Sequence, residues 1–304
     1  GYDVQLAAGT ITAGGTLGIL IPPSIMLVVM GPILNVPVTD LFAAAIMPGL
    51  MLAALYTGYT LIRCHLNPSL GPVVPDDLIP DSMREVWIEF FKGLVPPVLL
   101  VGSSLGSILA GLATPTEGAA MGAVGAIFLT LAYRKLNFKV FQEALLKTLE
   151  ITTLIMILVC ASNFFGSVFS RLGTPTMITE ALMLLDLPPT AILLIVMALI
   201  FLLAWPLEWV PIVLIIIPIV LPLIEQLGFN LTWFGILVAV NLQTAWLSPP
   251  VALSAYFLKG VAPDWDLSDI YKGMMQFMAI QVVGLALIII FPKIVLWLPE
   301  YLYG

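Results

Sequence analysis

The feature that most constrains this chain is an interrupted apolar helix that occurs twice. Residues 1–24 align without gaps on residues 228–251, always 227 positions apart. Each copy has a Gly-aromatic-Asp/Asn turn, then an apolar stretch, then a Pro-Pro pair. A single Pro-Pro kink is explained by a structural role alone. Two interrupted apolar segments in corresponding halves of a chain, however, point to the binding site of a secondary transporter.

Composition determines the environment in which this repeat must fold. Hydrophobic residues make up 61% of the chain and charged residues 10%, and the mean hydropathy is +1.10. Soluble domains have about a quarter of their residues charged, so these values indicate an all-α polytopic membrane protein. The predicted apolar spans are 5–29, 41–62, 94–112, 117–133, 151–171, 189–204, 209–226, 231–258 and 274–297.

Two of these stretches predict a re-entrant hairpin. A bilayer core of about 30 Å needs about 20 helical residues, and 189–204 and 209–226 are both shorter. Residues 204–208 form the predicted tip, because Pro206 lacks the backbone donor that a helix requires. Non-helical backbone at membrane depth is tolerated only where protein or water covers it. The tip is therefore expected in the interior of the protein.

Cationic residues predict the orientation of the spans. If the hairpin enters and leaves from outside, only Arg171 and Lys293 lie on that side. The other side then collects Arg63, Arg84, Lys92, Arg134, Lys135, Lys139, Lys147, Lys259 and Lys272. Such a bias marks the cytoplasmic face. Segment 5–29 must then run outward and segment 231–258 inward, so the two broken helices are an inverted pair of repeats.

The predicted domain organisation follows from this repeat. The transport domain comprises the broken helix at 1–36 together with the hairpin and broken helix at 187–260. Between them, 37–186 holds scaffold-type helices and amphipathic arm helices, and 261–304 holds a C-terminal transmembrane helix. The expected arms, 82–94 and 138–150, have apolar residues at helical spacing, which predicts helices lying along the cytoplasmic interface. Solvated amphipathic linkers explain the same pattern.

The predicted chemistry lies at the two breaks. Glycines before Pro22 permit unwinding, while the prolines remove donors and leave upstream carbonyls without helical partners. Freed carbonyls inside a membrane protein form an oxygen cage suited to Na⁺. The second break has fewer glycines but more side-chain oxygens, at Asn241, Gln243, Thr244 and Ser248. In the competing interpretation, these groups only satisfy the local backbone.

Two acidic residues accompany the apolar segments. Glu117 follows Thr114 and Pro115 at the start of an apolar helix, where capping and ion or proton coupling both explain it. Glu208 lies at the predicted hairpin tip, where a carboxylate is costly without a cation, a donor or water, which favours a functional role. Trp205 beside it either shapes a substrate vestibule or marks an interface.

Other function classes find little support. The chain has one histidine, His65, and two distant cysteines, Cys64 and Cys160, which argues against a histidine-based metal or nucleophile site and against a disulfide framework. It has no basic patch for nucleic acid. An intramembrane enzyme using Glu117 or Glu208 lacks a catalytic partner, so no enzyme is predicted. A non-transporting scaffold subunit remains as an alternative.

Ordered motifs resemble one transporter family over nearly the whole chain. They are Gly-Thr-Leu-Gly-Ile-Leu-Ile-Pro-Pro-Ser at 15–24, Asp-Leu-Phe-Ala-Ala-Ala-Ile-Met-Pro-Gly at 40–49, Thr-Pro-Thr-Glu-Gly at 114–118 and Pro-Ile-Val-Leu-Pro at 218–222. They look like the large membrane (permease) subunit of tripartite ATP-independent periplasmic (TRAP) transporters. The resemblance implies a sodium-coupled elevator importer of a small organic anion in a bacterial or archaeal inner membrane.

The resemblance also implies partners and a missing segment. A smaller membrane subunit and a periplasmic substrate-binding protein are expected, with Na⁺ as the transported coupling ion and no organic cofactor. The family carries an earlier segment containing a first hairpin. Because this segment is not in the sequence, we expect the chain to be a fragment.

Matched positions give the implied site residues. The expected sodium-binding positions are Gly18, Ile21 and Pro23 at the first break and Ala245, Ser248 and Val251 at the second. The expected substrate-binding residues are Gly15, Thr16, Asn241, Gln243, Thr244, Trp205 and Glu208. The family often has Gly where this chain has Ala245, and Thr where it has Ser248. A carbonyl survives the first change and a hydroxyl survives the second.

Overall fold

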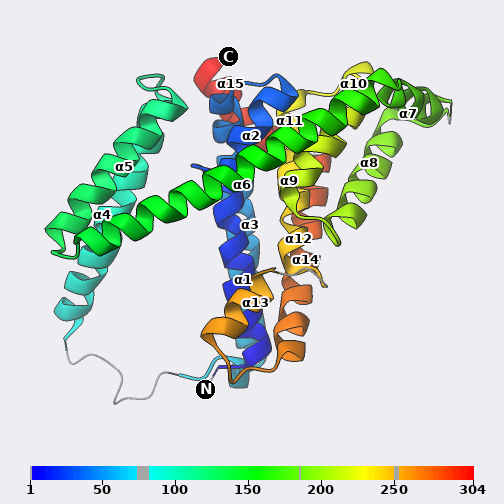
Figure 1. Ribbon diagram of the computed structural model, residues 1–304. Coiled ribbons are helices and arrows are strands. Elements are labelled where there is room, and N and C mark those ends of the chain that lie inside the picture. The colour runs from blue at the N-terminus through cyan, green and yellow to red at the C-terminus, as the bar shows by residue number, and fades with distance from the viewer. Residues whose placement is uncertain (1, 74–81, 185, 250–252) are drawn as a thin grey trace. The chain divides into compact units, whose positions relative to one another are not determined.

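The computed structural model describes residues 2–73, 82–184, 186–249 and 253–304, and these ranges form helices and loops without any strand (Figure 1). The elements are α1 (Val4–Leu20), α2 (Ile25–Leu34), α3 (Val38–Leu66), η1 (Pro68–Leu70), α4 (Met83–Leu109), α5 (Pro115–Ala132), α6 (Phe138–Arg171), α7 (Thr174–Met183), α8 (Pro189–Ala204), α9 (Trp209–Pro211), the π-helix η3 (Ile212–Ile216), α10 (Ile217–Gln226), α11 (Leu231–Leu242), α12 (Thr244–Leu247), α13 (Leu253–Val261), α14 (Leu267–Ile290) and α15 (Lys293–Tyr303).

Many of these helices are suited to a membrane. In the described ranges, six helical segments are long and apolar enough to cross one: α3, α4, α5, α6, the run α9–α10 and α14. Helices α1 and α2 qualify together as a seventh, bent by 43° at the break after Leu20. The predicted all-α polytopic membrane fold and the first broken helix are therefore confirmed.

The helices form two compact units, which are described separately. Unit 1 comprises Gly1–Gly71 and Ile155–Gly304, and unit 2 comprises Pro72–Leu154. Both helix breaks lie in unit 1. Helix α3, which the predicted domain organisation assigned to the scaffold, packs inside unit 1 against α1, α14 and α15. Which helices move together during transport stays a prediction.

In unit 1 the repeat extends well beyond the two breaks. A shift of 227 residues carries α1 onto 231–247, which α11 and α12 occupy together, and it carries α2 onto α13 and α3 onto α14. The starting caps correspond as well. Asp3 Oδ1 accepts a hydrogen bond from the Leu6 amide at 2.8 Å, and Asn230 Oδ1 accepts one from the Trp233 amide at 3.0 Å. These side chains satisfy donors that a helix start leaves unpaired.

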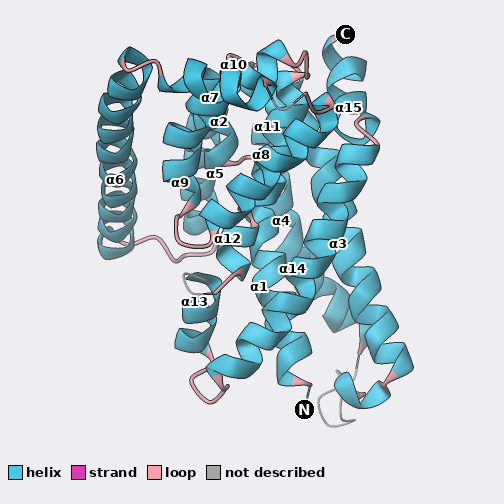
Figure 2. Cartoon of the chain, turned by 90° about the vertical axis from the view of Figure 1, so that its right-hand side faces the viewer, coloured by secondary structure: helices cyan, strands magenta, loops and turns pink. Residues whose placement is uncertain are grey.

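The two copies run in opposite directions. Figure 1 shows α1 rising from the N-terminal end toward α2, whereas α11 begins at the height of α2 and its chain descends through α12 to α13. Packing is reciprocal, since α1 lies against α14 and α11 lies against α3. Figure 2 shows α1 and α14 side by side. Their approach depends on glycine, because a Cβ on Gly273 would lie 2.0 Å from the Gln5 carbonyl oxygen.

The segment 189–226 forms two helical arms joined at the expected position. Helix α8 ends at Ala204, and α9 starts after Glu208. The turn lies at the height of α12 in Figure 1, and α8 contacts both η3 and α12. The second arm, Trp209–Gln226, is 18 residues long and is by length and composition a candidate span. Its length alone therefore does not make the hairpin re-entrant, and that assignment stays a prediction.

Three helix boundaries differ from the predicted ones. The expected arms 82–94 and 138–150 are not separate helices, because α4 and α6 continue through both arm and span. No helix-ending residue separates arm from span in α6, whose 34 residues extend about 51 Å. The expected span 274–297 is also shifted: α14 begins at Leu267 and ends before Pro292, which lacks a helix donor.

Unit 2 is built on the packing of α4 against α5. Ser104 Oγ donates to the Gly118 carbonyl at 2.6 Å. A Cβ on Gly118 would lie 2.5 Å from Ile108, and one on Gly125 would lie 2.2 Å from Leu100. Small residues thus let the two helices approach closely, as is common between membrane helices.

Candidate functional site

At the first break, two prolines leave two carbonyl groups without their helical donors, and only one of these carbonyls has another hydrogen-bond donor among the described residues. Pro22 and Pro23 lack the N–H groups that would bond the carbonyls of Gly18 and Ile19, four residues earlier. Ser24 Oγ donates to the Ile19 carbonyl. No hydrogen bond recorded for the described residues outside the helices ends on the Gly18 carbonyl. One freed oxygen is therefore capped, and the other is available.

The second break repeats this arrangement at the equivalent positions. Pro249 leaves the Ala245 carbonyl without its helical donor, and none of the bonds recorded between described residues outside the helices ends there. The next carbonyl, that of Trp246, accepts from Ser254 Oγ. Trp246 is the repeat equivalent of Ile19, so a serine caps the same carbonyl in each copy. Pro250 and the predicted sodium position Val251 lie outside the described residues.

A hydrogen bond between repeat-equivalent residues joins the two breaks. Gln243 Nε2 donates to the Thr16 carbonyl at 3.3 Å, and these residues are 227 positions apart. Two equivalent residues of an inverted pair can touch only near the pseudo-two-fold axis that relates the copies. The breaks therefore meet at this axis inside unit 1.

Gln281, on α14, is part of the same polar cluster and was not predicted. It is 0% exposed, and its Nε2 donates to the Val240 carbonyl at 2.7 Å and to Gln243 Oε1 at 3.0 Å. The sequence did contain a signal, because Gln281 is an uncharged amide inside an apolar span. Its partner depends on how α14 packs against α11, which the sequence alone does not show.

Asn241 connects the second break to the hairpin. Its Nδ2 donates to the Met197 carbonyl of α8 at 2.8 Å, and the side chain is fully buried. Its Oδ1 has no hydrogen-bond partner among the described residues, and neither does the buried hydroxyl of Ser248. Two side-chain oxygens near the second break are thus desolvated and unpaired, a costly state that a cation or water would relieve.

The threonines of the expected substrate site use their donors internally. Thr16 Oγ1 donates to the Ala13 carbonyl at 2.8 Å, and Thr244 Oγ1 donates to the Asn241 carbonyl at 2.6 Å. In this conformation neither hydroxyl is free to donate to a carboxylate. Gly15 and Thr16 line a cavity of about 420 Å³ between α1, α12 and α13, together with Thr12, Trp246 and Ser254.

The remaining expected substrate residues lie at the hairpin turn. Trp205 stacks edge-on against Phe201, with ring centroids 5.8 Å apart. Glu208 is half-buried, and across the described ranges no hydrogen bond or ion pair of its carboxylate is recorded. Among the described residues, no recorded hydrogen bond or cavity brings Trp205 or Glu208 together with the residues of the breaks. Their place in a substrate site stays a prediction.

The two breaks differ in how far protein encloses them. Ala245 is 3% exposed and Ser248 is 0% exposed, whereas Gly18 and Pro23 are exposed and Ile21 is half-buried. The hairpin arm α8 packs beside the second break.

Both breaks offer neutral oxygens, which fit a hard monovalent cation better than a transition metal. The described residues hold no cluster of three or more His, Cys, Asp or Glu residues.

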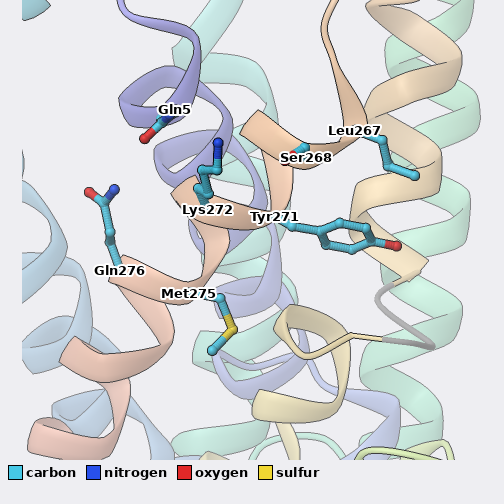
Figure 3. Close-up of a pocket in the computed structure, with 7 residues that line it drawn as sticks. All are labelled: Gln5, Leu267, Ser268, Tyr271, Lys272, Met275 and Gln276. Atoms are coloured by element: carbon cyan, nitrogen blue, oxygen red, sulfur yellow. The ribbon is translucent and has the colours of Figure 1, made fainter.

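A second polar cluster lies at the N-terminal ends of α1 and α14 (Figure 3). It borders an open pocket of about 770 Å³ lined by residues that include Gln5, Lys272 and Gln276. Gln5 Nε2 donates to Asp269 at 3.0 Å, and Gln276 Oε1 accepts from the Tyr59 hydroxyl at 2.7 Å. This cluster ties α1, α3 and α14 together, away from both breaks.

Comparisons with known proteins agree on one family. Residues 1–294 match the model of the family described as "Tripartite ATP-independent periplasmic transporter, DctM component". The sialic acid TRAP transporter large permease protein SiaM of Vibrio cholerae is 28% identical, over 100% of this chain and 69% of its own length. The C4-dicarboxylate large permease protein DctM of Pseudomonas aeruginosa is 30% identical, over 99% and 69%. The 2,3-diketo-L-gulonate large permease protein YiaN of Escherichia coli is 27% identical, over 97% and 68%.

Proposed function

This chain belongs to the DctM component family of TRAP transporters, and from that membership we propose that it imports a small organic anion by sodium-coupled secondary transport. The family consists of transporter permease subunits and not of enzymes, so the chain is a multi-pass permease of the bacterial inner membrane. The proposed partners are a small membrane subunit and a periplasmic substrate-binding protein that delivers the anion.

The proposed substrate class is a carboxylate. Relatives are named for sialic acid, C4-dicarboxylate and 2,3-diketo-L-gulonate, and each of these molecules carries at least one carboxylate at neutral pH. A carboxylate suits the positive ends of interrupted helices, where backbone N–H groups point outward. The helix that starts after the first break, α2, offers such an end within unit 1.

The observation that supports sodium coupling is the matched pattern of carbonyls at the two breaks. In each repeat a serine caps the second freed carbonyl, while the first, at Gly18 or Ala245, has no recorded donor among the described residues. If the breaks were only kinks, both freed carbonyls should be satisfied, because an orphan peptide group in a membrane protein costs several kcal/mol, roughly. One Na⁺ at each break would supply the missing interaction.

The proposed mechanism uses the breaks to link ion binding to anion binding. Sodium ions near Gly18, Ile21 and Pro23, and near Ala245, Ser248 and Val251, stabilise the hairpin tips and complete an anion site near mid-membrane. The proposed anion contacts are Gly15, Thr16, Asn241, Gln243, Thr244, Trp205 and Glu208. The transport domain then moves as an elevator against the scaffold helices. Because the two threonine donors are engaged internally, we expect helix ends and amides to make the main contacts.

The test is uptake by the complete transporter in liposomes. A panel of carboxylates, sugar acids and keto acids is first screened for an acid that raises the melting temperature of the binding protein. Uptake of that labelled acid is then measured with an inward Na⁺ gradient and with an equal K⁺ gradient. We expect accumulation only with Na⁺, and uptake that is indifferent to the sodium gradient would contradict the proposal.

A further inference from the structure

We propose that Gln281 is a positioning residue that couples the two helix breaks, an inference that rests on the proposed sodium-coupled function. Among the described residues, Gln281 has no recorded hydrogen bond to the first break. It acts through Gln243, whose carboxamide spans the distance to Thr16 across the pseudo-two-fold axis. Three residues on α14, the second break and α1 thereby form one chain of hydrogen bonds.

The geometry of this chain leaves the Gln243 carboxamide one orientation. A carboxamide accepts only through its oxygen and donates only through its nitrogen. Because Gln281 Nε2 donates to Gln243 Oε1 at 3.0 Å, the Gln243 nitrogen must face the other way, toward the Thr16 carbonyl. Gln281 is itself fixed by its second bond, to the Val240 carbonyl at 2.7 Å, and by complete burial.

The positions of the linked groups explain why this chain bears on both breaks. Thr16 precedes Gly18, the first free carbonyl, by two residues on the same helix. Gln243 directly precedes α12, the short turn that carries Ala245. A shift of the Gln243 carboxamide is therefore expected to change the position of the freed Ala245 carbonyl relative to the freed Gly18 carbonyl. Because a cation binds tightly only when its oxygen ligands lie at suitable distances, such a shift would lower the affinity for Na⁺.

The two repeats correspond to each other, but only the second one contributes an amide such as Gln281 to this chain of hydrogen bonds. The position equivalent to Gln281 in the first repeat is Ala54, which has no polar side chain. The repeat therefore does not itself require an amide at this place, and a pair of symmetric packing helices would not need one. The asymmetry places the coupling on α14 alone, so a single substitution removes it.

The competing interpretation is that Gln281 only satisfies the Val240 carbonyl. Loss of a purely structural bond lowers the melting temperature equally in any salt. Loss of a positioning bond changes the dependence on Na⁺ as well. Sodium alone is a sufficient probe, since any molecule that binds only the folded state raises its stability by an amount that grows with the ratio of its concentration to its dissociation constant.

The experiment measures thermal unfolding of the complete transporter across NaCl concentrations, with KCl holding ionic strength constant. The variants are Gln281→Leu and the less disruptive Gln281→Met. The matched control is Gln276→Leu, an amide on the same helix that bonds Tyr59 and Arg63 away from the breaks (Figure 3). We expect the half-saturating Na⁺ concentration to rise roughly three- to tenfold in both Gln281 variants, the factor for one lost hydrogen bond. The control should keep the wild-type value.

The outcomes separate this inference from the proposed function. If the wild-type protein shows no specific stabilisation by Na⁺, sodium coupling itself fails. If the wild type responds and both Gln281 variants respond with the same half-saturating concentration, the positioning role is overturned. A double variant with Gln243→Met adds a further check, because residues in one hydrogen-bond chain should show non-additive effects, and strictly additive shifts would also contradict the inference.

Discussion

At the scale of single residues, the buried hydroxyl of Ser248 distinguishes a sodium site from a simple kink. It is fully buried and has no partner among the described residues. An unsatisfied buried hydroxyl costs about 1–3 kcal/mol. That of Ser248 is close in sequence to the freed Ala245 carbonyl and to the unpaired Asn241 Oδ1, so something bound at the second break would satisfy several oxygens at once. A coupling ion near the second break fits that description.

Replacing Ser248 with Ala tests this directly. In KCl we expect the free energy of unfolding to stay the same or rise by about 1 kcal/mol, because the mutation removes an unsatisfied group. In Na⁺-driven uptake we expect the half-saturating Na⁺ concentration to rise about tenfold, the equivalent of about 1.4 kcal/mol. The control is Thr179→Val, which removes another buried unpaired hydroxyl from α7. Equal sodium dependence in both variants would contradict a ligand role for Ser248.

Glu117 illustrates a residue for which the structure supports the simpler explanation. The Thr114 amide and hydroxyl both donate to Glu117 Oε2, at 2.8 and 2.9 Å, and the Glu117 amide donates back to Thr114 Oγ1. This reciprocal pair is a capping box, which satisfies two donors at the start of α5. Its side chain lies in unit 2, whereas both breaks lie in unit 1.

Two substitutions separate capping from coupling at Glu117. Gln can replace a capping carboxylate as an acceptor but cannot carry charge. We therefore expect Glu117→Gln to keep both the melting temperature and the sodium dependence of uptake, and Glu117→Ala to lower the melting temperature only. Loss of sodium coupling in Glu117→Gln would show that the charge has a role in transport.

At the scale of elements, the sequence predicted those features that depend on local chemistry. The Pro-Pro pairs located the breaks, the Gly-aromatic-Asp/Asn turns located the starts of the two broken helices, and Pro206 located the hairpin turn. Only the boundary between each arm and its span was wrong, because amphipathic periodicity reports which face a helix exposes, not where the helix ends. Whether the arm segments lie along the membrane interface stays a prediction. Gln281 was missed for a related reason: its hydrogen bonds join residues about 40 positions apart, and no local pattern specifies them.

Between the described residues of the hairpin and those of the second broken helix, one side-chain hydrogen bond is recorded. Asn241 bonds the Met197 carbonyl, in the middle of an α8 face where Leu193, Val196 and Met197 are otherwise packed by apolar contacts. Apolar contacts alone specify poorly how far α8 is shifted along the axis of α11, since successive helical turns present similar apolar surfaces. The Asn241 bond therefore sets the register of α8 along α11.

We expect Asn241→Leu to destabilise the hairpin more than the rest of unit 1. Losing this buried hydrogen bond costs about 0.5–1.5 kcal/mol. Hydrogen exchange should accelerate in 189–204, because local opening needs less free energy there. Peptides from α3 serve as the internal control and should exchange at the wild-type rate. Uniform acceleration across both segments would argue against a register role.

At the scale of the whole molecule, inversion of the repeats is the property on which alternating access depends. Reciprocal packing of α1 on α14 and of α11 on α3, together with the bond between Thr16 and Gln243, supports a pseudo-two-fold axis in unit 1. The same axis predicts that equivalent loops lie on opposite sides of the membrane. Charge bias predicts which side: the loop between α2 and α3 outside, and the loop between α13 and α14 in the cytoplasm.

Pro37 and Asp264 test this arrangement, because they are exposed, lie in these two loops and are 227 positions apart. Single cysteines at each position are introduced after Cys64 and Cys160 are replaced by Ser, and retained uptake serves as the control for folding. With a membrane-impermeant maleimide, we expect Pro37→Cys to react only in right-side-out vesicles and Asp264→Cys only in inside-out vesicles. Two parallel copies would place both cysteines on one side, and that result would remove the structural basis for a symmetric exchange of inward-open and outward-open states.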